Sequence, residues 1–105
     1  FGAALAINNS GEVVGANANG GEMPCFALAA ESGTGDKEVL YWGRIRNDSW
    51  NFKVGSHIYV GTSNGELVDE DNKPVIAGGI VQALGVAIAT NKIFFNPSYV
   101  TVEIQ

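Results

Sequence analysis

The stretch IYVGTSNGELV, residues 58–68, carries the clearest fold signal in the chain. Two short runs of apolar residues flank a Ser-Asn-Gly turn at residues 63–65, and these residue types tolerate the positive φ angles of a tight hairpin. Because side chains alternate along a strand, Ile58 and Val60 lie on one face and Tyr59 on the other. The stretch therefore predicts a β-hairpin with one apolar face.

Similar turn signals recur along the whole chain at intervals of about ten residues. They are NNSGE at 8–12, NANGGE at 17–22, SGTGDK at 32–37, RNDS at 46–49, TSNGE at 62–66, EDNKP at 70–74 and TNK at 90–92. This spacing is typical of an all-β fold, either a small β-barrel or a sandwich of short antiparallel strands. The runs EVLYWGRI, HIYVG and KIFFN are predicted strands because their residue types suit a half-buried pleated surface.

Two alanine-rich runs compete as helices, CFALAAES at 25–32 and IVQALGVAIAT at 80–90. The second run has Gly85 at its centre with Val and Ile around it, which favours a strand. We interpret both runs as buried strands.

An internal repeat supports this interpretation. GAALAINNSGEVV, residues 2–14, aligns with GSHIYVGTSNGELV, residues 55–68, when Asn64 is treated as an insertion. Further along, PCFALAA can be matched with QALGVAI so that Phe26 lies on Leu84. The order of strands and turns in both halves predicts two similar β units that share one core.

Length and composition limit the remaining possibilities. The 105 residues, 46% of them hydrophobic, fit a single β domain spanning residues 1–105. The formal net charge of −5 disfavours nucleic acid as a partner unless the few Lys and Arg residues gather on one face. No run approaches the roughly 20 apolar residues of a membrane span. Cys25 is the only cysteine, which we expect to be buried, and the first residue is Phe1, as in a fragment of a longer chain.

Candidate chemistry is sparse. His57 is the only histidine and is expected to be exposed or on an edge strand, with Asp48 and Ser49 nearby in sequence but no nucleophile elbow. The acidic run VDEDNKP, residues 68–74, departs from a calcium-binding loop and is interpreted as a solvated hairpin loop. We therefore expect no enzyme activity, no cofactor and no metal.

The run RNDSWNFKVG, residues 46–55, concentrates charge and aromatic residues. The polar residues 47–49 are interpreted as a turn, and Trp50, Phe52 and Val54 as one inward strand face with Gly55 as its end. The competing interpretation is that Trp42 or Trp50 stacks on sugar rings, as in a carbohydrate-binding module. The core interpretation is favoured.

The sequence resembles a small β module of tailed-bacteriophage virion proteins, found in capsid decoration (cement) proteins and in head or tail fibres. The similarity covers most of the chain and lies in turns and core positions, with Ala27 where the module commonly has Gly. The matching residues are Gly43, Arg46-Asn47, Trp50, Gly55, Ile58-Tyr59-Val60, Gly65, Val81-Gln82, Gly85-Val86-Ala87 and Phe95-Asn96-Pro97-Ser98.

The resemblance implies a non-enzymatic structural protein, localised to the virion and assembled in the host cytoplasm. Its expected partners are the major capsid protein, other virion proteins and further copies of itself, with a trimer favoured. The alternative is a receptor- or glycan-binding domain of a tail fibre. Under either function, the side chains expected to make interface or ligand contacts are Arg46, Trp50, Lys53, Trp42 and Tyr99.

Overall fold

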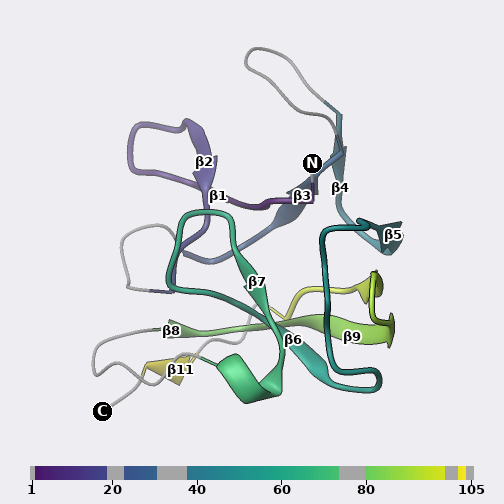
Figure 1. The fold of residues 1–105 in the computed structure, drawn as a ribbon. Coiled ribbons are helices and arrows are strands. Elements are labelled where there is room, and N and C mark those ends of the chain that lie inside the picture. The colour runs from purple at the N-terminus through teal and green to yellow at the C-terminus, as the bar shows by residue number, and fades with distance from the viewer. Residues whose placement is uncertain (1, 19–22, 31–37, 74–79, 99–101, 104–105) are drawn as a thin grey trace.

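The computed structural model of the chain describes residues 2–18, 23–30, 38–73, 80–98 and 102–103, with side chains up to residue 98. Two antiparallel sheets make up most of this part of the chain (Figure 1). The first sheet has the order β2-β1-β3-β4 and the second has the order β5-β10-β9-β6-β7. The first contains β1 (Ala4–Ile7), β2 (Val13–Gly15), β3 (Ala27–Ala29) and β4 (Val39–Leu40). The second contains β5 (Gly43–Arg46), β6 (His57–Val60), β7 (Leu67–Val68), β9 (Ala83–Ala89) and β10 (Lys92–Phe95).

Two short elements complete the described structure. A 3-10 helix, η1 (Glu70–Asn72), follows β7, and β8 (Ile80–Val81) pairs with β11 (Val102–Glu103). No α-helix occurs in the described ranges, so no helix there is long and apolar enough to cross a membrane.

The predicted all-β fold is confirmed, and its architecture is an open sandwich rather than a closed barrel. Both alanine-rich runs contain strands, β3 in the first and β8 with β9 in the second. The predicted strand at residues 38–45 is instead divided between the two sheets. Tyr41 and Trp42 form the bend at which the chain leaves β4 and enters β5.

One core cluster joins the two sheets, and its composition differs between them. The first sheet and the residues that follow β2 contribute mainly small side chains, namely Ala4, Ala6, Ala16 and Ala18, together with Leu28. The second sheet contributes large ones, Ile58, Val60, Leu84, Ile93 and Phe95. Small residues opposite large ones allow the layers to interdigitate at the density of a protein interior. Cys25 is buried in the same cluster as predicted, and desolvation raises the pKa of its thiol to about 11, which keeps the thiol protonated and unreactive.

The predicted repeat is present in the pairing register of both sheets. Strands β2, β1, β3 and β4 of the first sheet correspond to β7, β6, β9 and β10 of the second. In the first sheet Ala6 pairs with Val14 and Leu5 with Ala27, and in the second Tyr59 pairs with Val68 and Ile58 with Gly85. These are the partners that the sequence alignment matches. The aligned glycines also share the left-handed conformation, with φ of +77° at Gly2 and +84° at Gly55, and +81° at Gly11 and +78° at Gly65.

The two units bury opposite faces, although they share one register. In β6, Ile58 and Val60 are buried, whereas their counterparts Leu5 and Ile7 face outward because Ala4 and Ala6 fill the core side of β1. The units therefore share one core, as the repeat predicts, but they contribute to it with non-equivalent residues.

A buried glutamine connects the units. Gln82 is 1% exposed, and its side-chain Oε1 accepts a hydrogen bond of 2.7 Å from the backbone N–H of Cys25. Its Nε2 donates to the backbone carbonyls of Cys25, at 2.9 Å, and Ser98, at 2.7 Å. The amide thus pairs with Cys25 as a neighbouring strand residue would, across 57 positions of sequence.

The β6–β7 hairpin connects the units a second time. The carbonyl of Gly65 accepts a hydrogen bond of 2.9 Å from the backbone N–H of Ala4, and the carbonyl of Gly61 accepts one of 2.9 Å from that of Ala18. In return, the Gly65 N–H donates to the carbonyl of Ala16. The side chains of Asn17 and Asn64 add a hydrogen bond of 2.8 Å. The tip therefore continues the first unit's hydrogen bonding.

The Gln82→Met variant tests the glutamine connection. Methionine fills a similar volume but leaves the buried Cys25 N–H and two carbonyls without their partner, so we expect a loss of about 3 kcal/mol in the free energy of unfolding. Urea unfolding followed by circular dichroism measures it. Asn51→Ala, at an exposed position, is the control and should change the free energy of unfolding by less than about 0.5 kcal/mol. Equal stability of the two variants would contradict the assigned role of Gln82.

Candidate functional site

The segment 46–55 begins with the predicted turn. Asn47 Oδ1 accepts from the backbone N–H of Ser49 at 2.9 Å, and the Asn47 carbonyl accepts from Trp50 N–H at 3.0 Å. This side-chain-stabilised turn carries the chain from β5 toward the second half of the segment.

The predicted inward strand over residues 50–54 is wrong. No strand forms there; Phe52 is buried, Trp50 is half-buried and Val54 is 60% exposed. Backbone hydrogen bonds explain the difference, because Phe52 N–H donates to Thr90 and Lys53 N–H donates to the side chain of Asp69 instead of to a neighbouring strand. Gly55 lies in the turn that follows, with φ of +84°, and not at the end of a strand as predicted.

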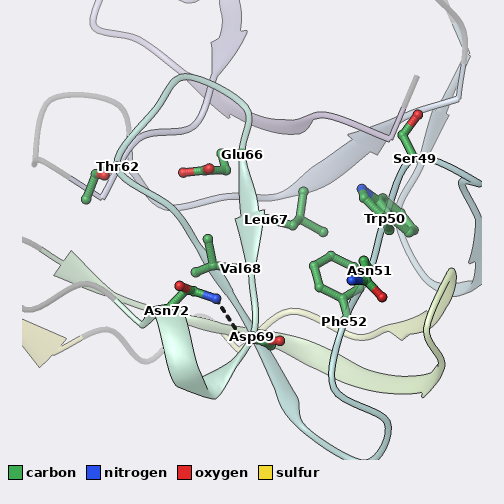
Figure 2. A pocket seen from close by; sticks show the side chains of 10 residues that line it. All are labelled: Ser49, Trp50, Asn51, Phe52, Thr62, Glu66, Leu67, Val68, Asp69 and Asn72. Atoms are coloured by element: carbon green, nitrogen blue, oxygen red, sulfur yellow. Dashed lines mark hydrogen bonds between the residues drawn. The ribbon is translucent and has the colours of Figure 1, made fainter.

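A groove with a volume of about 510 Å³ lies beside this segment (Figure 2). One side is formed by residues 49–52 and the other by β7 and its flanks. Its side chains combine aromatic, amide, hydroxyl and carboxylate groups: Ser49, Trp50, Asn51, Phe52, Thr62, Glu66, Leu67, Val68, Asp69 and Asn72. Aromatic rings beside hydrogen-bonding groups are a combination that suits an uncharged polar ligand with an apolar face.

Trp50 is held at the edge of the groove by two contacts. Its ring lies 5.3 Å from that of Phe52, and its six-membered ring rests against Gly2, where an added Cβ would approach Trp50 Cζ2 to 2.8 Å. Figure 2 shows the nitrogen-bearing edge of the indole turned toward Leu67 across the groove. This contact between Gly2 and Trp50 was not predictable from the sequence, because 48 positions separate the two residues.

Asp69 forms the floor at the other side of the groove. It is 7% exposed, and its carboxylate accepts from Lys53 N–H at 3.0 Å and from Asn72 Nδ2 at 3.1 Å. These hydrogen bonds, the one from Lys53 first, lower the pKa of Asp69. The acidic run is therefore only partly the predicted solvated loop: Asp69 is buried and connects the loop to residue 53, whereas Glu70, Asp71 and Asn72 are exposed.

The other predicted contact residues lie outside the groove. Arg46 is exposed, and its Nε donates to Asp48 Oδ1 at 2.7 Å, which lowers the pKa of Asp48. Lys53 is exposed, and Trp42 is 63% exposed with its ring edge against Phe94 at 5.0 Å. Tyr99 lies outside the described residues. Of the four predicted contact residues that the structure describes, only Trp50 lines the groove.

A second hollow, of about 380 Å³, collects basic residues that we did not single out together from the sequence. Arg44 and Arg46 on β5 and Lys92 on β10 line it, beside Ile88 on β9. Arg46 and Lys92 are direct cross-strand partners, so two like charges face each other. The alternation of charged and apolar residues in Arg44-Ile45-Arg46 indicates a strand with a basic outer side, but the pairing of β5 with β10 cannot be predicted from either strand alone.

His57 is exposed as predicted and lies on β6, with Nδ1 3.3 Å from Glu70 Oε1. The hydrogen bond from His57 lowers the pKa of Glu70. No group of three or more metal-ligating side chains occurs among the residues that the structure describes.

Comparisons with protein-family models, with curated proteins and with solved structures find no match to this chain.

The contact between Gly2 and Trp50 can be tested with two matched glycines. Gly2 and Gly11 have nearly equal φ angles, +77° and +81°, but an added Cβ meets Trp50 at Gly2 and nothing within 4 Å at Gly11. Gly11→Ala should cost about 1 kcal/mol of unfolding free energy through backbone strain alone. Gly2→Ala should cost at least about 1 kcal/mol more and shift the tryptophan fluorescence, because the indole must move. Identical effects of both variants would argue against this placement of Trp50.

Proposed function

We propose that this chain is a non-enzymatic structural protein of a tailed-phage virion. It acts as a capsid decoration or head-fibre module that packs on the particle, and on copies of itself, as a symmetric oligomer. The resemblance in turns and core positions supports the virion class. The single observation that carries the packing function is an apolar surface on the outer side of the first sheet.

This outer apolar face consists of Leu5, Ile7 and Val13, and the exposed Tyr41 lies in the bend after β4. Ile7 and Val13 are direct cross-strand partners and are 54% and 55% exposed. Tyr41 is 62% exposed, and its ring lies 6.0 Å from that of Phe26. A sheet that is apolar on both sides gains free energy when a second surface covers the outer side.

The open edges of the sheet support the same function. Strands β2 and β4 form the edges of the first sheet in the described structure, and they contain only three and two residues. Symmetric copies that cover such edges and the adjoining apolar face would stabilise one another. Repetition over a particle would then multiply weak contacts through avidity.

The test uses Ile7→Lys, with Val54→Lys as the matched control at a position that is equally exposed but lies outside the outer apolar face. We expect the wild-type chain to sediment as an oligomer and to be detected by mass spectrometry in purified particles of the phage that encodes it. Ile7→Lys should weaken self-association about tenfold or more, because a cation would replace buried apolar area. A monomeric wild-type chain that is absent from particles would contradict the proposal.

A second candidate function, binding of a neutral glycan, is favoured by the groove. The indole of Trp50 offers aromatic area and an N–H donor at the groove, and the amides of Asn51 and Asn72 offer further hydrogen bonds. The lining includes the carboxylates of Glu66 and Asp69 and no Lys or Arg, so an acidic sugar would be repelled.

Glycan binding is tested on an array with three variants. Trp50→Phe and Asn51→Ala should each weaken binding of a neutral glycan, by up to about tenfold, because they change the groove without opening the core. Trp42→Ala is the control, since Trp42 is exposed outside the groove. A folded wild-type chain that binds no glycan, or variants that all bind equally, would remove this candidate.

A further inference from the structure

The outward side of β5 and β10 is basic in a chain that is acidic as a whole. Three of the six Lys and Arg residues, Arg44, Arg46 and Lys92, line one hollow there, while the formal net charge of the chain is −5. Only Asp48 forms an ion pair with them among the described residues. Ile88, which is 45% exposed, and Trp42 add apolar area beside the charges. We refer to these five side chains, Arg44, Arg46, Lys92, Ile88 and Trp42, as the basic face.

The basic face is not explained by stability. Arg46 and Lys92 are directly opposed across two strands, an arrangement that destabilises a sheet. Arg44 is exposed and lies opposite Phe94, and neither Arg44 nor Lys92 has an ion pair in the described structure. An external anionic surface would relieve this repulsion and cover Trp42 and Ile88 together.

The first unit of the same chain has the complementary surface. By sequence, residues 1–40 have a formal net charge of −4 and residues 41–105 a net charge of −1, and the acidic side chains of residues 1–40 that the structure describes are Glu12 and Glu38, both exposed. Glu12 is exposed and adjoins Val13 at the β1–β2 hairpin, beside exposed Ile7. We refer to Ile7, Glu12 and Val13 as the hairpin face. The hairpin face offers a carboxylate beside apolar area, and the basic face offers cations beside apolar area, so the two faces are complementary in charge.

We propose that the hairpin face of one copy docks on the basic face of the next, in a head-to-tail contact. The inference rests on the proposed self-association and names the two surfaces that form it. The hairpin face carries the carboxylate of Glu12 and the basic face carries three cations, so the mixed contact is electrostatically preferred over a contact between two hairpin faces. Figure 1 shows β2 and β5 on different sides of the molecule, so each copy can use both surfaces at once. A contact between two different surfaces generates a ring such as a trimer when its rotation closes.

Charge reversal tests the contact. Arg44→Glu and Glu12→Arg should each weaken self-association at least roughly tenfold, which is the effect expected for a close charge pair at an interface. The chain that carries both substitutions should recover most of the wild-type association, because every contact then has the reversed pair. Sedimentation velocity measures the association, with added salt expected to weaken that of the wild type.

Lys73→Glu is the matched control, since it reverses an exposed cation outside the basic face and should leave association unchanged. Circular dichroism and thermal unfolding verify that each variant is folded. If the wild type associates and all variants associate equally, the head-to-tail contact is wrong while the proposed function stands. If Arg44→Glu alone reduces occupancy on particles, another acidic virion protein covers the basic face and the second copy is ruled out. A monomeric wild type that is absent from particles would overturn the function itself.

Discussion

The pairing of Gln82 with the backbone of Cys25 is the constraint on which the arrangement of the two units depends. One buried amide satisfies the N–H and the carbonyl of Cys25 and reaches the carbonyl of Ser98 as well. Buried backbone groups without partners cost free energy, so only the observed placement of the first unit against β9 satisfies all three together. Because Cys25 lies two residues before the start of the short strand β3, fixing its backbone also constrains which face of β3 and β1 meets the core.

That choice of face explains the outer surface of the molecule. The repeat gives both units apolar residues at equivalent positions, and the second unit buries them as Ile58 and Val60. In the first unit the alanines of β1 are turned inward instead, which leaves Ile7 exposed. Because side chains on a strand have a period of two, inverting the buried face between otherwise equivalent units leaves apolar residues of the first unit exposed at positions that are core positions in the second.

The sequence was sufficient for local features and for their order. Turn residues located the hairpins, and the repeat correctly predicted two similar β units, because the equivalent registers of the two sheets depend on short loops and on glycines with positive φ. Features that depend on packing between distant segments were not predictable. Tyr41 and Trp42 form a bend within an apparently continuous strand, Val54 is exposed despite its alternation with Trp50, and Gly2 contacts Trp50 only in the folded chain. In each case a tertiary contact overrides the local pattern.

The candidate sites divide by charge in a way that follows from the same topology. Residues 50–52 and β7 enclose a groove that contains acids and amides but no cation, whereas β5 and β10 present cations on the outer side of the second sheet. An uncharged ligand is therefore matched to the groove, and an anionic macromolecular surface to the basic face. The carboxylate of Asp69 accepts hydrogen bonds from the backbone N–H of Lys53 and from the side chain of Asn72, so this side of the groove is preorganised without a ligand. The basic face keeps opposed like charges, which the carboxylate of the proposed head-to-tail contact would compensate.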